Sequence, residues 1–358
     1  MGKLQTIIKN LIREKGSIPF RDFMDLALYQ PELGYYHSDR NVFGKTGDYY
    51  TAPEVHSVFG QTIARDLLVK WQELGSPEPL VIVEFGAGRG KLARDILDHI
   101  QMEAPQTYKT TQYWIIEKSA HLRIVQQEKM QGHPVRWLSS LEERAPFSGI
   151  VLSNELIDAM PVHLVTETKY GLQEVYVSAR DGQFHELLVP VSDHRIRDYL
   201  MKYAIPLQQG QRAEVNLDAL DWLGQVANCL TDGFVITIDY GDEAQILYEG
   251  RWNGTLRGYQ HHRLSDHLLD HPGEQDLTAD VNFTALMKYG EQVGFTTVFY
   301  GTQSRFLVEA GIFGQLTDKL AEDPFQCMDM KRNMAIKHLI MPGGMGERFK
   351  VLVQRKNL

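Results

Sequence analysis

Cysteine is scarce in this chain, since only Cys229 and Cys327 occur among its 358 residues. Two cysteines so far apart argue against a disulfide framework and against a zinc site built from thiolates, and they favour a reducing compartment. The sequence also has no apolar run near the ~18 residues of a membrane-spanning helix, and no apolar secretory segment at its N-terminus. We therefore expect a soluble intracellular protein without membrane insertion.

Basic residues are in the minority, because Lys and Arg total 37 against 46 for Asp and Glu, which gives a net charge of -9. Phosphate backbones select basic surfaces, so nucleic acid is not an expected partner. Apolar residues make up 43% and charged residues 23%, as in ordinary globular proteins. The length suits about two domains, or one α/β domain with insertions.

The first 79 residues read as mostly helical, and we predict a helical N-terminal cap over 1–79. Its best-marked helix is predicted from Thr51 to Leu74. Thr51 and Glu54 have the spacing of a capping box, and Pro53 in the first turn lacks only an N–H that would be unpaired anyway. Apolar residues recur on one face of this stretch.

From Leu80 onward, short apolar strands alternate with helical stretches, which is typical of βαβ units and a largely parallel sheet. A helix is predicted over 283–293. Strands are predicted over 80–85, 113–117, 135–138, 149–153, 234–240, 297–300 and 349–354. The fold class is therefore α/β, with the main domain over 80–358.

Two insertions, at about 163–200 and 241–280, interrupt this alternation. Residues 163–191 alternate with period two between turn signals, which predicts an antiparallel β meander. Residues 241–280 have little periodicity and are expected to form a long functional loop. The latter holds His261, His262, His267 and His271 with neighbouring acids, but their spacing fits no compact ligand pattern, so no metal is expected.

The strand ending at Phe85 runs through Gly86, Gly88 and Gly90 directly into a helix. Glycines at such a turn let a ligand approach the backbone, and the helix N-terminus offers it unpaired N–H groups. A dinucleotide site would favour a third glycine where Lys91 stands. Glu84 favours a cofactor other than a dinucleotide, because a carboxylate near the strand end suits a cationic sulfonium-amino acid cofactor better than a pyrophosphate.

Glu117 follows the second strand of the predicted sheet. A carboxylate there can accept hydrogen bonds from both ribose hydroxyls of an adenosine, which NAD and S-adenosylmethionine sites both require. Glu117 therefore supports an adenosine cofactor without distinguishing the two, and by itself it is also compatible with a solvated acid at a strand end.

These residues belong to motifs that run nearly end to end through the chain. The motifs are GDYYTAPE from Gly47, VEFGAGRGKL from Val83, SNELIDAMP from Ser153, IDYG from Ile238, HPGEQDLTADVNF from His271, GTQSRFLVEAGI from Gly301 and MPGGMGERFKVL from Met341. The chain resembles the MidA-like class I S-adenosylmethionine-dependent methyltransferases. Its departures are mild, such as Ala87 where the family often has Pro, and Tyr49 and Tyr50 where Phe is common.

The resemblance implies a Rossmann-like sheet of seven strands with the last one antiparallel, and S-adenosylmethionine as the cofactor. Mitochondrial members look like protein-arginine methyltransferases needed for respiratory complex I assembly, so a protein substrate is expected. By similarity, the cofactor contacts are Glu84, Gly86, Gly88, Gly90 and Glu117. A bacterial cytoplasm is favoured over the mitochondrial matrix, and a homodimer is left open.

Candidate acceptor residues follow the strand that ends at Ser153, namely Asn154, Glu155 and Asp158. A carboxylate pair holds a planar guanidinium bidentately. Glu155 and Asp158 share one face if a helical turn begins there, and we predict that they position the acceptor with Asn154. The alternative is an acidic first helical turn that is favoured by the helix dipole.

Four further residues are candidates for the substrate pocket: Asp48, Glu54, Asp239 and Tyr240. Two other functions also stay open at this point. One is a non-catalytic assembly factor or chaperone that retains the methyltransferase fold, although such a scaffold need not keep the glycines and acids above. The other is a nucleotide-dependent oxidoreductase, which the glycine spacing disfavours.

Overall fold

The computed structural model describes residues 2–37, 52–191, 193–204, 206–260, 263–265, 267–317, 327–341 and 345–357. Contacts between residues divide the chain into two units, each built from three segments. Unit 1 comprises Met1–Tyr49, Ile157–Gly224 and Gly241–Tyr289, and unit 2 comprises Tyr50–Leu156, Gln225–Tyr240 and Gly290–Leu358. The domain boundaries expected from the sequence stay a prediction.

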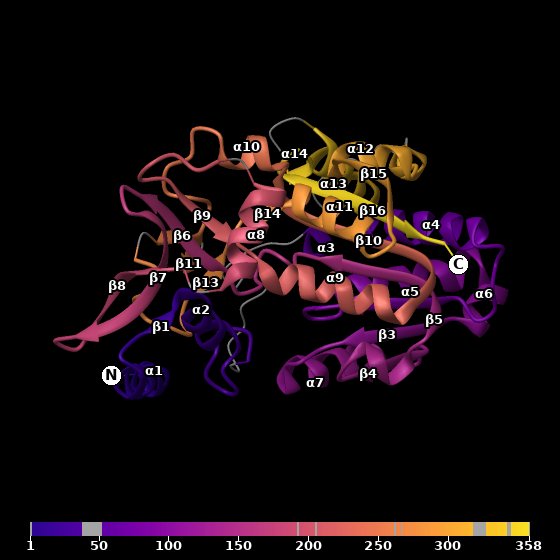
Figure 1. Ribbon diagram of the computed structural model, residues 1–358. Coiled ribbons are helices and arrows are strands. Elements are labelled where there is room, and N and C mark those ends of the chain that lie inside the picture. The colour runs from indigo at the N-terminus through magenta and orange to yellow at the C-terminus, as the bar shows by residue number, and fades with distance from the viewer. Residues whose placement is uncertain are drawn as a thin grey trace. The chain divides into compact units, whose positions relative to one another are not determined.

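Unit 2 is built on a mostly parallel sheet whose strands follow the order β15-β16-β10-β5-β2-β3-β4 (Figure 1). The strands are β2 (Val81–Phe85), β3 (Gln112–Ile116), β4 (Val135–Leu138), β5 (Phe147–Asn154), β10 (Leu230–Asp242), β15 (Thr296–Thr302) and β16 (Phe349–Lys356). The last strand, β16, is antiparallel to both of its neighbours, whereas β4, β3, β2, β5 and β10 pair in parallel. The predicted fold class is therefore confirmed.

Helices bury one face of this sheet in a large apolar core. The core joins α4 (Val58–Glu73), α5 (Lys91–Glu103), α12 (Gln303–Glu309) and α13 (Met328–Ile340) to side chains of the strands. Ile63, Ile96 and Ile236 are fully buried in it. The remaining helical segments of unit 2 are α3 (Ala52–Val55), α6 (Pro105–Thr110), η1 (Leu141–Arg144), α7 (Ala120–Lys129), η2 (Ile312–Gln315) and α14 (Met345–Arg348).

The helix predicted from Thr51 to Leu74 is interrupted in the structure. Thr51 lies outside the described residues, α3 ends at Val55, and α4 begins only at Val58. The ring of His56 accepts a hydrogen bond from the Val58 N–H at 3.1 Å. Such a local side-chain bond competes with the helical backbone pattern, so the prediction of one continuous helix was wrong here.

Unit 1 contains the antiparallel meander predicted at 163–191. Its strands are β1 (Ile18–Pro19), β6 (His163–Thr168), β7 (Gly171–Arg180), β8 (Gln183–Pro190) and β9 (Arg212–Val215), in the order β1-β7-β6-β9 with β8 beside β7. All of their pairings are antiparallel. The helices of unit 1 are α1 (Lys3–Lys15), α2 (Phe20–Tyr29) and α8 (His194–Tyr203). Two further helices, α9 (Leu217–Cys229) and α11 (Phe283–Gln292), begin in unit 1 and end in unit 2, and α11 confirms the predicted helix near 283–293.

The prediction of one long loop over 241–280 was wrong. This segment holds α10 (Ala244–Tyr248) and a small antiparallel sheet of β11 (Arg257–Gln260), β12 (Arg263–Ser265) and β13 (Asp276–Thr278), and β14 (Val281–Asn282) follows it. The buried Glu214 carboxylate accepts the N–H groups of Thr255 and Leu256 at 2.7 and 2.9 Å. Contacts distant in sequence therefore order strands too short to show a periodicity. None of the described helices is long and apolar enough to cross a membrane.

Candidate functional site

The glycine-rich turn between β2 and α5 lies where the strand order of the sheet reverses. β2 pairs with β3 on one side and with β5 on the other, so Gly86, Glu117 and Asn154 come at the same carboxyl edge. In sheets of this kind, ligands bind outside the carboxyl ends of the strands at such a switch point.

Left-handed backbone explains why this turn contains three glycines. Gly86, Gly88 and Gly90 have φ values of 65°, 53° and 75°, which glycine adopts without the penalty of a Cβ atom. A Cβ at Gly86 would also lie 2.9 Å from Cδ1 of Leu156. Bare backbone therefore leads directly into the N-terminus of α5, whose first N–H groups have no intrahelical acceptor.

Glu84 is buried beside this turn, with 2% of its surface exposed. The Tyr113 hydroxyl donates a hydrogen bond to its Oε2 at 2.7 Å. Burial raises the pKa of Glu84 to about 7, and the nearby Glu117 charge adds to the rise while the Tyr113 hydrogen bond opposes it. The site therefore holds a carboxylate whose charge is costly until a cation lies next to it.

Glu117 follows β3 directly, and hydrogen-bond donors hold its carboxylate. Its Oε1 accepts the Ser119 N–H at 2.8 Å, and its Oε2 accepts the Gln126 side-chain amide at 3.1 Å. Burial is the main reason that the pKa of Glu117 is raised, and these hydrogen bonds oppose the rise. A carboxylate offers about four acceptor positions on its two oxygens, so Glu117 suits the paired hydroxyls of a ribose.

Sequence reasoning missed Tyr113 and Gln126, although each carries a signal. Gln126 follows the buried Leu122 by four residues on α7, and its side chain is fully buried. A polar side chain on the apolar stripe of a helix requires partners. Tyr113 is a fully buried tyrosine in a central strand, so its hydroxyl requires a partner as well.

The predicted helical turn after β5 does not form. Glu155 has a φ of 52°, and its N–H donates to the Ile238 carbonyl at 2.9 Å. The Asn154 side-chain amide donates to Glu155 Oε1 at 3.1 Å. Within the described part of the chain, the buried Oδ1 of Asn154 accepts no hydrogen bond. The condition under which Glu155 and Asp158 would share a helix face is therefore not met, because a left-handed residue cannot begin such a turn.

Asp158 belongs to unit 1, so its predicted pairing with Glu155 of unit 2 stays a prediction. Only 4% of Asp158 is exposed, and its backbone carbonyl accepts the Ala279 N–H at 2.9 Å. Tyr29 donates to the carbonyl next to it, that of Ala159, at 2.8 Å. Asp158 therefore lies beside the strand β13 and the helix α2.

Two tyrosines and a second buried acid continue this cluster. The rings of Tyr29 and Tyr36 stack with centroids 5.7 Å apart. The Tyr36 hydroxyl donates to Asp276 Oδ1 at 2.8 Å, and Asp276 is 3% exposed. Carboxylates and aromatic faces thus gather in unit 1 around the segment that carries Asp158.

The other pocket candidates have different surroundings. Asp239 is fully buried and accepts the Tyr240 N–H at 2.9 Å. The Tyr240 ring packs edge-on against Phe349, with centroids 5.6 Å apart. Glu54 is half-buried on α3, and Asp48 lies outside the described residues. The His261 and His262 positions also lie outside them, and no group of three or more potential metal ligands occurs among the residues that are described.

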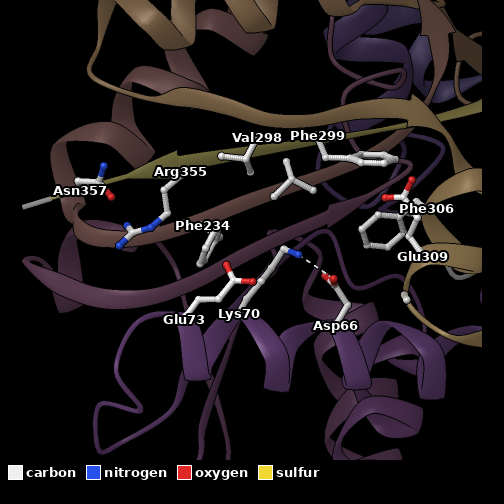
Figure 2. A pocket seen from close by; sticks show the side chains of 12 residues that line it. Asp66, Lys70, Glu73, Phe234, Val298, Phe299, Phe306, Glu309, Arg355 and Asn357 are labelled. Carbon is white, nitrogen blue, oxygen red and sulfur yellow. Dashed lines mark hydrogen bonds and ion pairs between the residues drawn. The ribbon is translucent and has the colours of Figure 1, made fainter.

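A cavity of about 510 Å³ lies elsewhere in unit 2, over the amino end of β10. Figure 2 shows Lys70 reaching toward Asp66 inside it, with Phe234 and Arg355 on the walls. Lys70 pairs with Asp66 at 2.7 Å and Arg355 pairs with Asp232 at 2.5 Å. Both cations in this cavity are thus already matched by carboxylates, and the predicted cofactor residues do not line it.

Comparison with known proteins agrees with the arrangement of strands and turn. A family model described as "Putative S-adenosyl-L-methionine-dependent methyltransferase" matches residues 62–301. The chain belongs to this family. The match includes the glycine-rich turn, Glu117 and the segment after β5.

Relatives of known name or structure extend the likeness to almost the whole chain. A crystal structure of a Burkholderia thailandensis protein bound to S-adenosyl-homocysteine has a TM-score of 0.88 and 32% identity, covering 99% of this chain and 92% of that one. The Drosophila melanogaster "Protein arginine methyltransferase NDUFAF7 homolog, mitochondrial" is 28% identical, covering 98% and 84%. The Homo sapiens "Protein arginine methyltransferase NDUFAF7, mitochondrial" is 28% identical, covering 94% and 80%. The resemblance, the fold class and S-adenosylmethionine as the family's cofactor are thereby confirmed.

Proposed function

We propose that this protein transfers a methyl group from S-adenosylmethionine to an arginine side chain of a protein substrate. The observation that carries the proposal is the glycine turn at the switch point of the sheet, flanked by the buried carboxylates of Glu84 and Glu117. The family match supports the reaction class. The names of the Drosophila and human relatives support arginine as the acceptor.

The residues at the turn fit this cofactor. Bound S-adenosylmethionine supplies a methyl group on an electrophilic sulfonium. Glu84 provides negative charge for the cationic amino acid part, and Glu117 accepts from the ribose hydroxyls. The backbone of Gly86, Gly88 and Gly90 contacts the cofactor where side chains would obstruct it. These roles orient the methyl donor toward the acceptor.

The acceptor requires groups that hold a planar cation. The proposed positioning groups are Asn154, Glu155 and Asp158. Asp276 and the stacked Tyr29 and Tyr36 are near Asp158 within unit 1. Carboxylates bind a guanidinium by paired hydrogen bonds, and tyrosine faces attract its charge.

The predicted candidates for the pocket wall stay Asp239, Tyr240, Glu54 and Asp48. The bacterial cytoplasm and the homodimer also stay predictions.

Calorimetry with S-adenosyl-homocysteine tests the cofactor part of this proposal. The wild-type protein is expected to bind, and Gly88→Val is expected to bind much more weakly. Gly132→Val is the matched control, because Gly132 has a φ of 87° with open space around it. Absence of wild-type binding, or equal affinity for Gly88→Val, would refute the site.

Mass spectrometry tests the acceptor. Proteomes of cells with and without the gene are compared for arginine peptides that differ by about 14 or 28 mass units, which correspond to one or two methyl groups. Loss of such peptides, restored by the wild-type gene and not by Gly88→Val, is expected. Cofactor binding without any methylated arginine would instead favour a non-catalytic assembly role.

A further inference from the structure

Gln126 bridges the two halves of the candidate cofactor site. Its side-chain amide nitrogen donates to the Gly88 carbonyl at 2.7 Å and to Glu117 Oε2 at 3.1 Å. Both of its amide protons are thus used, one on the glycine turn and one on the acid after β3. The residue is fully buried on α7, so these bonds are protected from water.

Trp137 fixes which way this amide points. Its indole Nε1 donates to Gln126 Oε1 at 2.9 Å. An indole N–H can only donate, so the Gln126 oxygen must face Trp137 and the nitrogen must face Gly88 and Glu117. Trp137 lies on β4. These hydrogen bonds therefore connect the glycine turn before α5 to the helix α7 and the strand β4.

We propose that Gln126 is a positioning residue that holds Glu117 in register with the glycine turn for the ribose of the cofactor. The inference rests on the proposed cofactor site. Gln126 and the Ser119 N–H each use one lone pair of Glu117, on different oxygens. The remaining lone pairs of Glu117 therefore point in fixed directions before the cofactor binds. The Glu117 side chain then loses less conformational entropy on binding.

The test compares two ligands that differ only in the groups that Glu117 would contact. Adenosine carries both ribose hydroxyls, whereas 2′,3′-dideoxyadenosine carries neither. Each is titrated against wild-type protein and Gln126→Met, a variant of similar length without amide donors, by competition with S-adenosyl-homocysteine in a calorimeter. If the variant only misorients the Glu117 carboxylate, the affinity for adenosine falls and that for the dideoxy analogue does not. If the variant destabilises the fold in general, the affinity for both ligands falls equally.

We expect Gln126→Met to weaken adenosine about tenfold, as for the loss of hydrogen bonds to a charged group, with little change for the dideoxy analogue. Gln127→Met is the matched control, because Gln127 is exposed on the same helix, and its affinities should equal those of the wild type. Equal weakening of both ligands, or no change in either, would overturn the proposal.

Trp137→Phe provides a second variant if Gln126→Met does not fold. It should weaken adenosine in the same selective way by a smaller factor. Where Gln126→Met does fold, adding Trp137→Phe to it should cause no further loss, because the group that Trp137 orients is gone. Additive effects would contradict the inferred role of Trp137. If the wild-type protein binds neither S-adenosyl-homocysteine nor adenosine, the proposed function fails; binding without the selective loss refutes only the role of Gln126.

Discussion

Replacing Glu84 by Gln should stabilise the ligand-free protein, by an amount that depends on pH. The Gln carbonyl can still accept the Tyr113 hydroxyl, which lies 2.7 Å from the carboxylate, but it carries no charge into the buried site. Burial raises the pKa of Glu84 from 4.5 to about 7. Each pKa unit represents about 1.4 kcal/mol, so the ionised carboxylate costs the folded state about 3 kcal/mol.

The direction of this pH dependence follows from the number of protons that the folded and unfolded states bind. Between pH 4.5 and about 7 the folded protein keeps the Glu84 proton that the unfolded chain has released, so stability falls as pH rises through this window. Above about pH 7 the cost is complete. The free energy of unfolding of Glu84→Gln should therefore exceed that of the wild type by up to about 3 kcal/mol at pH 8, and by far less at pH 5.

Urea unfolding followed by circular dichroism at pH 5, 6, 7 and 8 measures this difference. Glu103→Gln is the control, because Glu103 is an exposed acid at the end of α5, and its difference from the wild type should stay near zero throughout. A Glu84→Gln protein that is no more stable than the wild type at pH 8 would refute the reasoning. A gain that is the same at every pH would do so too, because it would arise from packing rather than charge.

Three further predictions concern the cofactor, the folded state and the acceptor. S-adenosylmethionine should bind about tenfold more tightly at pH 8 than at pH 6, because Glu84 ionises across this range; calorimetry should show no such dependence in Glu84→Gln. Gly233→Ala should lower the free energy of unfolding by about 2 kcal/mol or more, since a Cβ there would lie 1.9 Å from a carbonyl of β5; an unchanged melting temperature would contradict this. Tyr36→Phe, which removes a hydrogen bond to Asp276, should raise the KM for the acceptor several-fold without changing the cofactor Kd; the exposed Tyr170→Phe is the control.

The parallel sheet could be predicted from the sequence because its central strands are buried on both faces. Such strands appear as short, nearly continuous apolar runs, as in β2, which is buried at every position. The glycine turn was visible for a related reason, since left-handed backbone at Gly86, Gly88 and Gly90 demands a particular residue type. Structural features that constrain the residue type locally can therefore be predicted from the sequence.

Features that depend on distant partners could not be predicted in this way. The small sheet within 241–280 relies on Glu214, which accepts hydrogen bonds from residues about forty positions later. The Glu84–Tyr113 hydrogen bond joins two strands that are separated by a helical crossover. The left-handed backbone of Glu155 has no sequence signal, because it is not a glycine.

The buried acid beside the glycine turn also has a consequence for the protein inside a cell. At neutral pH the buried charge of Glu84 lowers the stability of the ligand-free protein. A ligand that brings positive charge next to Glu84 offsets this cost, so the ligand-bound protein has the higher free energy of unfolding. Proteases act on the fraction of molecules that is open at any moment. When the methyl donor is depleted, more of this protein should be degraded, so its abundance should follow the supply of its own cofactor.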